Sequence, residues 1–164
     1  ELASTVLLKF SDILRYQLYE CNQQHVFLHQ EIQYLQDLVA IEEIRWQEEL
    51  SVQCVWKIET KQLQIAPLLL VPLVENAFKH VSRLPHQQGY VHINCKEEQG
   101  KLTLAIENSY NDKYKREKQQ GGIGILNITE RLKIQYPDAH TFQLEEKGDT
   151  FTVVLQIDLN HDNR

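Results

Sequence analysis

The chain has 164 residues, which suits one domain with an appendage and is too short for two full domains. Hydrophobic residues make up 42% and charged residues 24%, the composition of a soluble globular protein. The net charge of −6 and the pI of about 5.6 argue against a nucleic-acid partner held through phosphate contacts. The longest apolar run, APLLLVPLV, is too short to span a bilayer, and no signal peptide is recognisable.

Three well-separated cysteines, Cys21, Cys54 and Cys95, form no C-x-x-C pair. This pattern favours a reducing compartment over a disulfide framework or a zinc site. The chain contains no methionine, not even at position 1. We therefore expect it to be part of a longer protein, and its function to be one part of the parent's.

The first fifty residues are predicted to form two helices separated by ECNQQH. Val6, Phe10 and Leu14 recur at helical spacing before this interruption, and Ile32 and Leu35 do so after it. Neither stretch contains glycine or proline, so both helices can be long and regular. Two amphipathic helices without a core of their own must pack on each other, on the rest of the chain or on a partner.

After residue 49 the pattern changes to that of strands. The alternation in LSVQCVWKI predicts a strand, and YVHINCKEEQGKLTLAIEN predicts a hairpin that turns at Gln99–Gly100. A second hairpin, turning at residues 147–149, closes the chain. Helices are predicted over 67–81 and about 124–136, the latter ended by Pro137. Five strands and two helices predict an α+β domain with its helices on one face of a sheet.

The helix predicted around PLVENAFKH has a polar side of unusual composition. On a helical wheel its apolar residues share one arc, and the opposite arc carries Glu75, Asn76, Lys79 and His80. The ordinary explanation is a solvated helix face. However, a carboxylate can act as a general base, an amide can bind a hard cation, and lysine and histidine can contact phosphate oxygens. The helix alone does not decide between these explanations.

Three glycines, Gly121, Gly122 and Gly124, precede the helix in QQGGIGILNITERLKIQY. Glycines let the backbone approach an anion, and the free amides of a helix start point towards it, so the cluster predicts either a phosphate site or a plain helix start. No G-x-x-x-x-G-K-S/T motif is present, which excludes a P-loop. The glycines follow a basic loop rather than a strand, which excludes the Rossmann fingerprint, and the lack of H-R-D and D-F-G excludes a eukaryotic-type kinase.

Four segments in order resemble the ATP-binding end of a bacterial two-component sensor histidine kinase of the Lyt type. They are FSDILRYQLY, EIQYLQDLVAIEEIR, PLLLVPLVENAFKH, which resembles the N box, and GGIGILNITERLKIQYP, which resembles the second glycine box. The resemblance implies a helical hairpin over residues 1–48, the end of a dimerisation and phosphoacceptor region. It implies an ATP-binding catalytic domain over 49–160. The implied fold of that domain is a two-layer α/β sandwich of the Bergerat (GHKL) type, with a mixed, mostly antiparallel sheet.

The resemblance also implies roles for individual residues. Glu75 would be the catalytic base that polarises the acceptor histidine, and Asn76 would hold the Mg²⁺ that bridges the ATP phosphates. The other positions implied to bind ATP are Lys79, His80, Asn108, Gly122, Gly124, Ile125 and Thr150. Residues 109–120 would form a lid over the nucleotide, after which Gly121 would permit the turn. The basic residues of this lid, Lys113, Lys115, Arg116 and Lys118, suit a loop near polyphosphate and equally suit a solvated charge run.

Two features depart from the family pattern. Asn108 in AIENSYND stands where the family has the Asp of D-x-G, which accepts a hydrogen bond from the adenine amino group. An Asn oxygen can accept the same bond, although without the charge that makes such bonds strongest. None of the seven histidines lies in the N-P-H-F setting of the phosphorylated histidine. His25 and His29 lack the neighbours of a metal site and are interpreted as surface residues.

The implied function is that of an enzyme, a histidine protein kinase that uses ATP and Mg²⁺. The γ-phosphoryl group would pass to a histidine upstream of this chain, and then to a response regulator, often one with a LytTR DNA-binding domain. The resemblance further implies homodimerisation through the N-terminal helices, no direct contact with nucleic acid, and a cytoplasmic domain of a membrane-anchored parent. The alternative is a non-catalytic dimerisation and regulatory module whose nucleotide site has decayed, with Asn108 as the trace.

Overall fold

The chain forms helices at its N-terminal end and a sheet covered by helices over the remainder. The structure is a computed structural model that describes residues 2–20, 22–82, 87–111 and 123–162. Its helices are α1 (Leu2–Arg15), the π-helical turn η1 (Tyr16–Glu20), α2 (Leu28–Trp46), the 3₁₀ turn η2 (Gln47–Glu49), α3 (Val71–His80), α4 (Ile123–Gln135) and η4 (Leu159–Asp162). Its strands are β1 (Val26–Phe27), β2 (Leu50–Ile58), β3 (Gln64–Ile65), β4 (Gly89–Glu98), β5 (Lys101–Ser109), β6 (His140–Lys147) and β7 (Thr150–Asp158).

The main sheet has five strands in the order β2-β4-β5-β7-β6. Strand β2 runs parallel to β4, and the three other neighbouring pairs are antiparallel. Both predicted hairpins are present, and Gln99 and Gly100 have the positive φ angles of a tight turn. The predicted mixed, mostly antiparallel sheet is therefore confirmed. The two-stranded pairing of β1 with β3 was not predicted.

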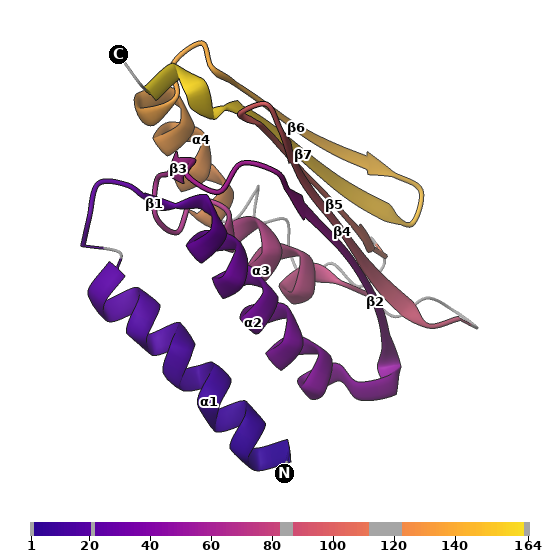
Figure 1. Cartoon of the computed structure of the whole chain (residues 1–164). Coiled ribbons are helices and arrows are strands. Elements are labelled where there is room, and N and C mark those ends of the chain that lie inside the picture. The colour runs from indigo at the N-terminus through magenta and orange to yellow at the C-terminus, as the bar shows by residue number, and fades with distance from the viewer. Residues whose placement is uncertain (1, 21, 83–86, 112–122, 163–164) are drawn as a thin grey trace.

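Helices cover one face of this sheet, as Figure 1 shows. Helix α3 packs on β5 and on α4, whereas α2 packs on β2 and α3. The covered face is apolar because alternate strand residues point into it, including the buried Val91, Ile93, Leu104 and Ile106. The arrangement confirms the predicted α+β sandwich preceded by a helical hairpin.

Helix α3 begins later than the sequence predicted, at Val71 rather than at residue 67. Residues 67–70 instead form turns that carry Leu68 with φ +54°. Pro72 consequently lies in the first helical turn. A proline is tolerated at this position without loss of a helical hydrogen bond, because first-turn N–H groups have no partner within a helix.

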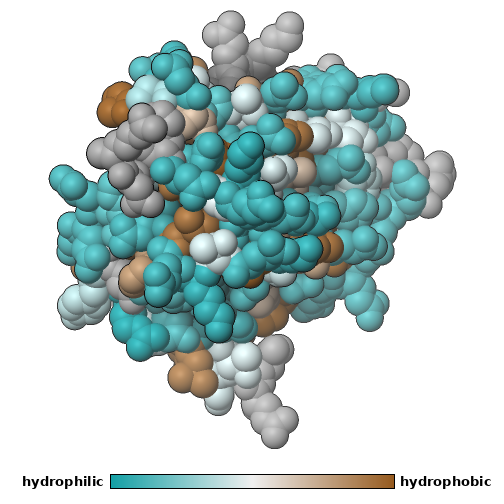
Figure 2. Space-filling model, turned by 45° about the horizontal axis from the view of Figure 1, so that its top comes forward, coloured by the Kyte–Doolittle hydropathy of each residue, from teal (hydrophilic) through white to brown (hydrophobic). Residues whose placement is uncertain are grey.

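Helix α1 lies on the outer side of α2, farthest from the sheet (Figure 1). Ile13 and, just beyond the helix, Tyr16 are buried. Six large apolar side chains of α1 and η1 are exposed: Leu7, Leu8, Phe10, Leu14, Leu18 and Tyr19. The face of the molecule in Figure 2 is mostly hydrophilic and interrupted by small hydrophobic groups. None of the helices in the described part of the chain combines the length and apolarity needed to cross a bilayer.

Candidate functional site

The polar side of α3 is exposed along its length. Glu75, Lys79 and His80 are exposed and Asn76 is half-buried. The opposite side of the helix, formed by Leu73, Val74, Ala77 and Phe78, is buried against the core. The two arcs predicted from the helical wheel are thus separated as expected, with the apolar arc fixing α3 to the sheet.

The start of α4 lies beside the start of α3. A Cβ atom built on Gly124 would lie 4.0 Å from the Cβ atom of Pro72. Pro72 and Asn76 are four residues apart, so they share one side of α3. The glycine at the mouth of α4 is therefore on the side of α3 that carries Asn76, as a shared ligand site would require.

Of the other site positions predicted near the start of α4, the structure describes only some. Ile125 is buried within the first turn of α4. Gly121, Gly122 and the lid residues Lys113, Lys115, Arg116 and Lys118 lie outside the described residues. Their predicted roles stay predictions.

Asn108 lies near the end of β5 and is only 1% exposed. Side-chain alternation places it on the helix-covered face, like Leu104 and Ile106. Its Nδ2 donates to the Ser109 carbonyl oxygen at 3.0 Å. Within the described part of the chain, its Oδ1 receives no hydrogen bond, so this oxygen is the acceptor that Asn108 can offer to a ligand.

Ser109 ties this strand end to the residue that follows α3. The Ser82 backbone N–H donates to the Ser109 carbonyl at 2.9 Å, and the Ser109 hydroxyl donates to the Ser82 carbonyl at 2.7 Å. The Ser109 hydroxyl also accepts from the Tyr90 backbone N–H at 3.0 Å. Asn108 is thereby held close to the C-terminal end of α3, where Lys79 and His80 lie.

Thr150, by contrast, is not brought together with Asn108. Its hydroxyl lies 2.8 Å from the Tyr90 hydroxyl. In the β5–β7 register Asn108 opposes Phe151 and Ser109 opposes Thr150. Neighbouring strand residues point to opposite faces, so the side chain of Thr150 is on the face away from the helices.

Glu75 lies on the part of α3 that faces α2. Burial raises the pKa of the Glu42 carboxyl on α2, nearby Arg45 and Trp46 oppose this rise, and the negative charge of Glu75 adds to it. Glu75 is therefore close enough to α2 for its charge to act there. Glu75 and Asn76 thus point to different neighbours, one towards the N-terminal helices and the other towards α4.

The turn before α3 is held by side chains that the sequence interpretation missed. The carboxylate of Glu31 accepts hydrogen bonds from the backbone N–H groups of Leu68 at 2.9 Å and Leu70 at 3.1 Å. From α4, Arg131 donates to the carbonyls of Pro67 and Leu68 at 2.7 and 3.0 Å. Glu31 was detectable as an acid among the apolar positions of α2, between Leu28 and Leu35, whereas its partners were not.

Burial raises the pKa of Glu31. The hydrogen bonds from Tyr16, Leu68 and Leu70, together with the charge of Arg131, act in the opposite direction without cancelling the effect of burial. Because an unpaired buried carboxylate is costly, these contacts identify Glu31 as a fixed part of the structure rather than a surface acid.

The fold defines a class: an α+β sandwich of the GHKL type preceded by a helical hairpin. The model of the Histidine kinase family matches residues 1–50. Sensor protein kinase HptS of Staphylococcus aureus is 36% identical over 80 residues, which are 49% of this chain and 15% of the relative. This match thus spans a small part of that relative's length.

Solved structures with the same fold are histidine kinases as well. The catalytic domain of histidine kinase ThkA has a TM-score of 0.57 at 13% identity, covering 82% of this chain and 95% of that one. The histidine kinase domain of an Erythrobacter litoralis blue-light activated histidine kinase has a TM-score of 0.58 at 15% identity, covering 98% and 76%. At such identities the likeness shows the fold. The sequence matches point the same way, because residues 1–50 are similar to the Histidine kinase family and 80 residues are similar to a sensor protein kinase.

Proposed function

We propose that this chain binds Mg-ATP between α3, the start of α4 and Asn108, as the catalytic part of a sensor histidine kinase. In the intact protein the γ-phosphoryl group would pass to a histidine upstream of residue 1 and then to a response-regulator aspartate. The observation that carries the proposal is the placement of Asn76 and Asn108. Asn76 lies on the side of α3 next to the α4 start, and Asn108 is buried near the end of the same helix.

At the phosphate end, the residue types fit the ligand. The amide oxygen of Asn76 is a hard donor suited to Mg²⁺, which keeps most of its ligands from water and phosphate. Bound Mg²⁺ would neutralise charge on the phosphates during transfer. Lys79 and His80, one helical turn further on, are exposed and suit contacts with phosphate oxygens.

Glu75 is proposed as the base that polarises the acceptor histidine. It is exposed, and its negative charge contributes to the raised pKa of Glu42 on α2. An acceptor carried by the helical region would approach α3 from this side. Positioning of the two reactants and neutralisation of charge supply most of the rate enhancement in such transfers.

At the base end, Asn108 is proposed to accept a hydrogen bond from the adenine amino group. Its Nδ2 is engaged with the Ser109 carbonyl, and a flipped amide would set two oxygens against each other. The oxygen of Asn108 therefore faces the ligand, which keeps the adenine preference that a carboxylate would give. The proposed roles of Gly122, Gly124, Ile125 and Thr150 rest on the family resemblance, and for Thr150 the Tyr90 contact supplies a different partner.

The proposed partners are a second copy of the chain and a response regulator. Leu7, Phe10 and Leu14 are exposed at the 3–4 spacing of a helix-pairing seam, which supports dimerisation through the N-terminal helices. ThkA, which shares the fold with a TM-score of 0.53, is described in complex with the response regulator TrrA. We further propose that the response regulator carries a LytTR domain. The parent protein is proposed to be anchored in a membrane, with this domain in the cytoplasm. The boundary between the helical region and the catalytic domain is proposed to lie near residue 48.

The decisive experiment has two stages. Titration with ATP and Mg²⁺ tests for a nucleotide site, and labelled phosphate transfer to a supplied upstream segment tests for catalysis. Binding followed by transfer supports the proposal. The alternative, a regulatory module with a decayed site, is favoured by the presence of Asn108 in place of Asp, and it predicts no binding at millimolar ATP.

A further inference from the structure

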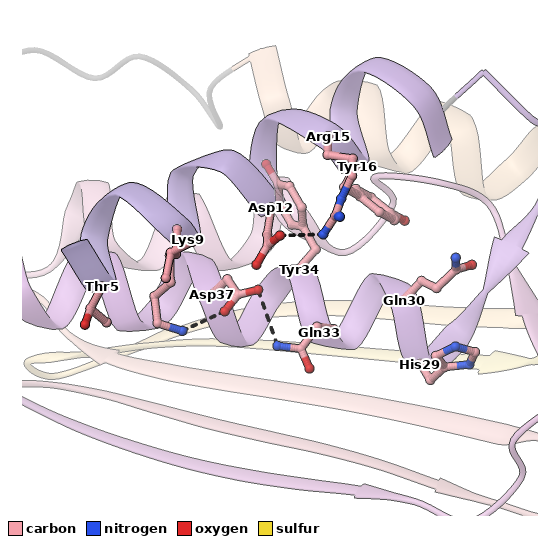
Figure 3. Close-up of a pocket in the computed structure, with 11 residues that line it drawn as sticks. Thr5, Lys9, Asp12, Arg15, Tyr16, His29, Gln30, Gln33, Tyr34 and Asp37 are labelled. Atoms are coloured by element: carbon pink, nitrogen blue, oxygen red, sulfur yellow. Dashed lines mark hydrogen bonds and ion pairs between the residues drawn. The ribbon is translucent and has the colours of Figure 1, made fainter.

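Helix α1 contacts α2 through a seam that is largely polar. Figure 3 shows side chains from both helices around a pocket of about 510 Å³. Lys9 pairs with Asp37 at 2.7 Å, and Gln17 donates to the Tyr34 hydroxyl at 2.7 Å. Exchanging such contacts for water costs little compared with opening an apolar core. The α1–α2 contact is therefore well suited to re-forming after a small shift of α1.

One contact in this region continues beyond α2 into the body of the domain. The Tyr16 hydroxyl, at the end of α1, donates to Glu31 Oε2 at 2.6 Å. The same oxygen accepts the Leu68 N–H, and Oε1 accepts the Leu70 N–H. Glu31 is fully buried, so these bonds are shielded from water. A single carboxylate thus links the end of α1 to the turn that precedes α3.

The turn itself requires such support. Leu68 has φ +54°, a left-handed conformation that is costly for a residue with a branched side chain and persists only when its surroundings impose it. Leu70 then starts α3, since its carbonyl accepts the Leu73 N–H at 3.1 Å. A shift of Leu68 and Leu70 would therefore move the first turn of α3 and, one turn later, Asn76.

We propose that Glu31 is a positioning residue that couples α1 to α3. Tyr16 holds one carboxylate oxygen of Glu31, and Glu31 holds the turn that sets the start of α3. A movement of α1 that withdraws the Tyr16 hydroxyl would loosen this turn and weaken nucleotide binding at Asn76. By reciprocity, bound nucleotide would favour the α1 position in which Tyr16 reaches Glu31. The inference rests on the proposed nucleotide site and adds a route by which the helical region regulates it.

The test compares two Tyr→Phe variants of the same seam in this chain. Tyr16→Phe removes the hydroxyl that bonds Glu31, and Tyr34→Phe removes one that bonds Gln17. Amide hydrogen exchange at Leu68 and Leu70 and the Mg-ATP dissociation constant are measured in both. We expect Tyr16→Phe to accelerate hydrogen exchange at both amides and to weaken Mg-ATP binding, each by roughly fivefold. This factor corresponds to the net free energy that one hydrogen bond usually contributes. Tyr34→Phe should leave both quantities within about twofold of wild type.

Glu31→Gln provides an independent variant, because its amide keeps one acceptor oxygen and sets a donor NH₂ group against the Leu68 or the Leu70 N–H group. It should accelerate exchange at these amides more than Tyr16→Phe does. Equal behaviour of the Tyr16 and Tyr34 variants, or unchanged exchange at Leu68 and Leu70 in Glu31→Gln, would overturn the coupling. If wild type fails to bind Mg-ATP, the proposed nucleotide site fails, and the exchange rates alone still decide whether Glu31 positions the turn.

Discussion

The two ends of the candidate site are built in different ways. At the α3 end, Glu75, Lys79 and His80 are exposed on one helix face. At the β5 end, Asn108 is buried and its amide nitrogen is already bonded within the chain. The exposed end can adapt to a flexible, charged group that arrives with its own metal ion, whereas the buried end is preorganised for a flat base. Substitutions should therefore affect charge-dependent chemistry at one end and base recognition at the other.

The largest effect is expected for Glu75→Gln. Removal of a general base should lower phosphoryl transfer by about 10²–10⁴-fold, because the amide cannot accept a proton. Mg-ATP affinity should stay within about twofold, since the substitution is isosteric and exposed. Glu130→Gln, which removes an exposed acid on α4, is the matched control. Full transfer activity in Glu75→Gln would exclude Glu75 as the base.

Asn76→Ala comes next in size. Loss of the proposed metal ligand should weaken ATP binding in the presence of Mg²⁺ by about 10–100-fold, the usual effect of disturbing a metal's ligand shell. Binding without Mg²⁺ should change much less, which separates a ligand role from general damage. Asn94→Ala removes the same type of side chain from an exposed position on β4 and should have no effect. An equal loss with and without Mg²⁺ would argue against metal binding by Asn76.

The buried end gives a smaller and more specific effect. Asn108→Ala should weaken ATP binding by roughly tenfold, the weight of one buried hydrogen bond to the base, and should reduce the preference over GTP. Unchanged nucleotide binding would rule out base recognition by Asn108.

Asn108→Asp sharpens the same point, although it restores the residue that the family usually has. The carboxylate would lack the N–H group that now donates to the Ser109 carbonyl. We therefore expect no gain in ATP affinity and a loss of thermal stability, measured by melting of both proteins at neutral pH. A clear gain in affinity would show that the Ser109 contact does not set the orientation of the side chain.

The smallest expected effect is on stability rather than on activity, and it concerns Glu97, at the turn end of the β4–β5 hairpin. Burial alone would raise the pKa of Glu97, but hydrogen bonds from Thr60, Gly100 and Glu59 outweigh it and lower this pKa. A lowered folded-state pKa adds stability above the ordinary value near 4.5, and this stability is lost as the pH falls below it. Glu97→Gln should thus destabilise the chain by about 1–2 kcal/mol at pH 7 and by less at pH 4, measured by urea unfolding. An equal loss at both pH values would contradict the assignment.

Much of the fold could be predicted because its signals are local. Strand alternation, the turn at Gln99–Gly100 and the helix stop at Pro137 each depend on a few neighbouring residues, and all agree with the structure. The two arcs of α3 were likewise predictable from periodicity alone. Local patterns do not reveal contacts between residues far apart in the sequence, and these contacts could not be predicted.

The start of α3 shows the limit clearly. The apolar run before Val71 looks helical, but Glu31 and Arg131 hold it as a turn from residues more than thirty positions away. Thr150 shows a second limit, because its hydroxyl lies 2.8 Å from the Tyr90 hydroxyl, a contact between residues 60 positions apart that no local pattern gives. Glu31 itself stood out only as a charge among apolar neighbours, and its partners became apparent from the packing of α1, α2 and α3.

The central claim is that one Mg-ATP molecule contacts both ends of the site at once. The most direct test is an NMR titration of this chain with a non-hydrolysable ATP analogue, following the side-chain amides of Asn76 and Asn108. We predict that both signals shift together, saturate at one equivalent, and depend on Mg²⁺ at Asn76. No saturable shift at millimolar nucleotide, or shifts confined to the α1–α2 pocket, would contradict the claim.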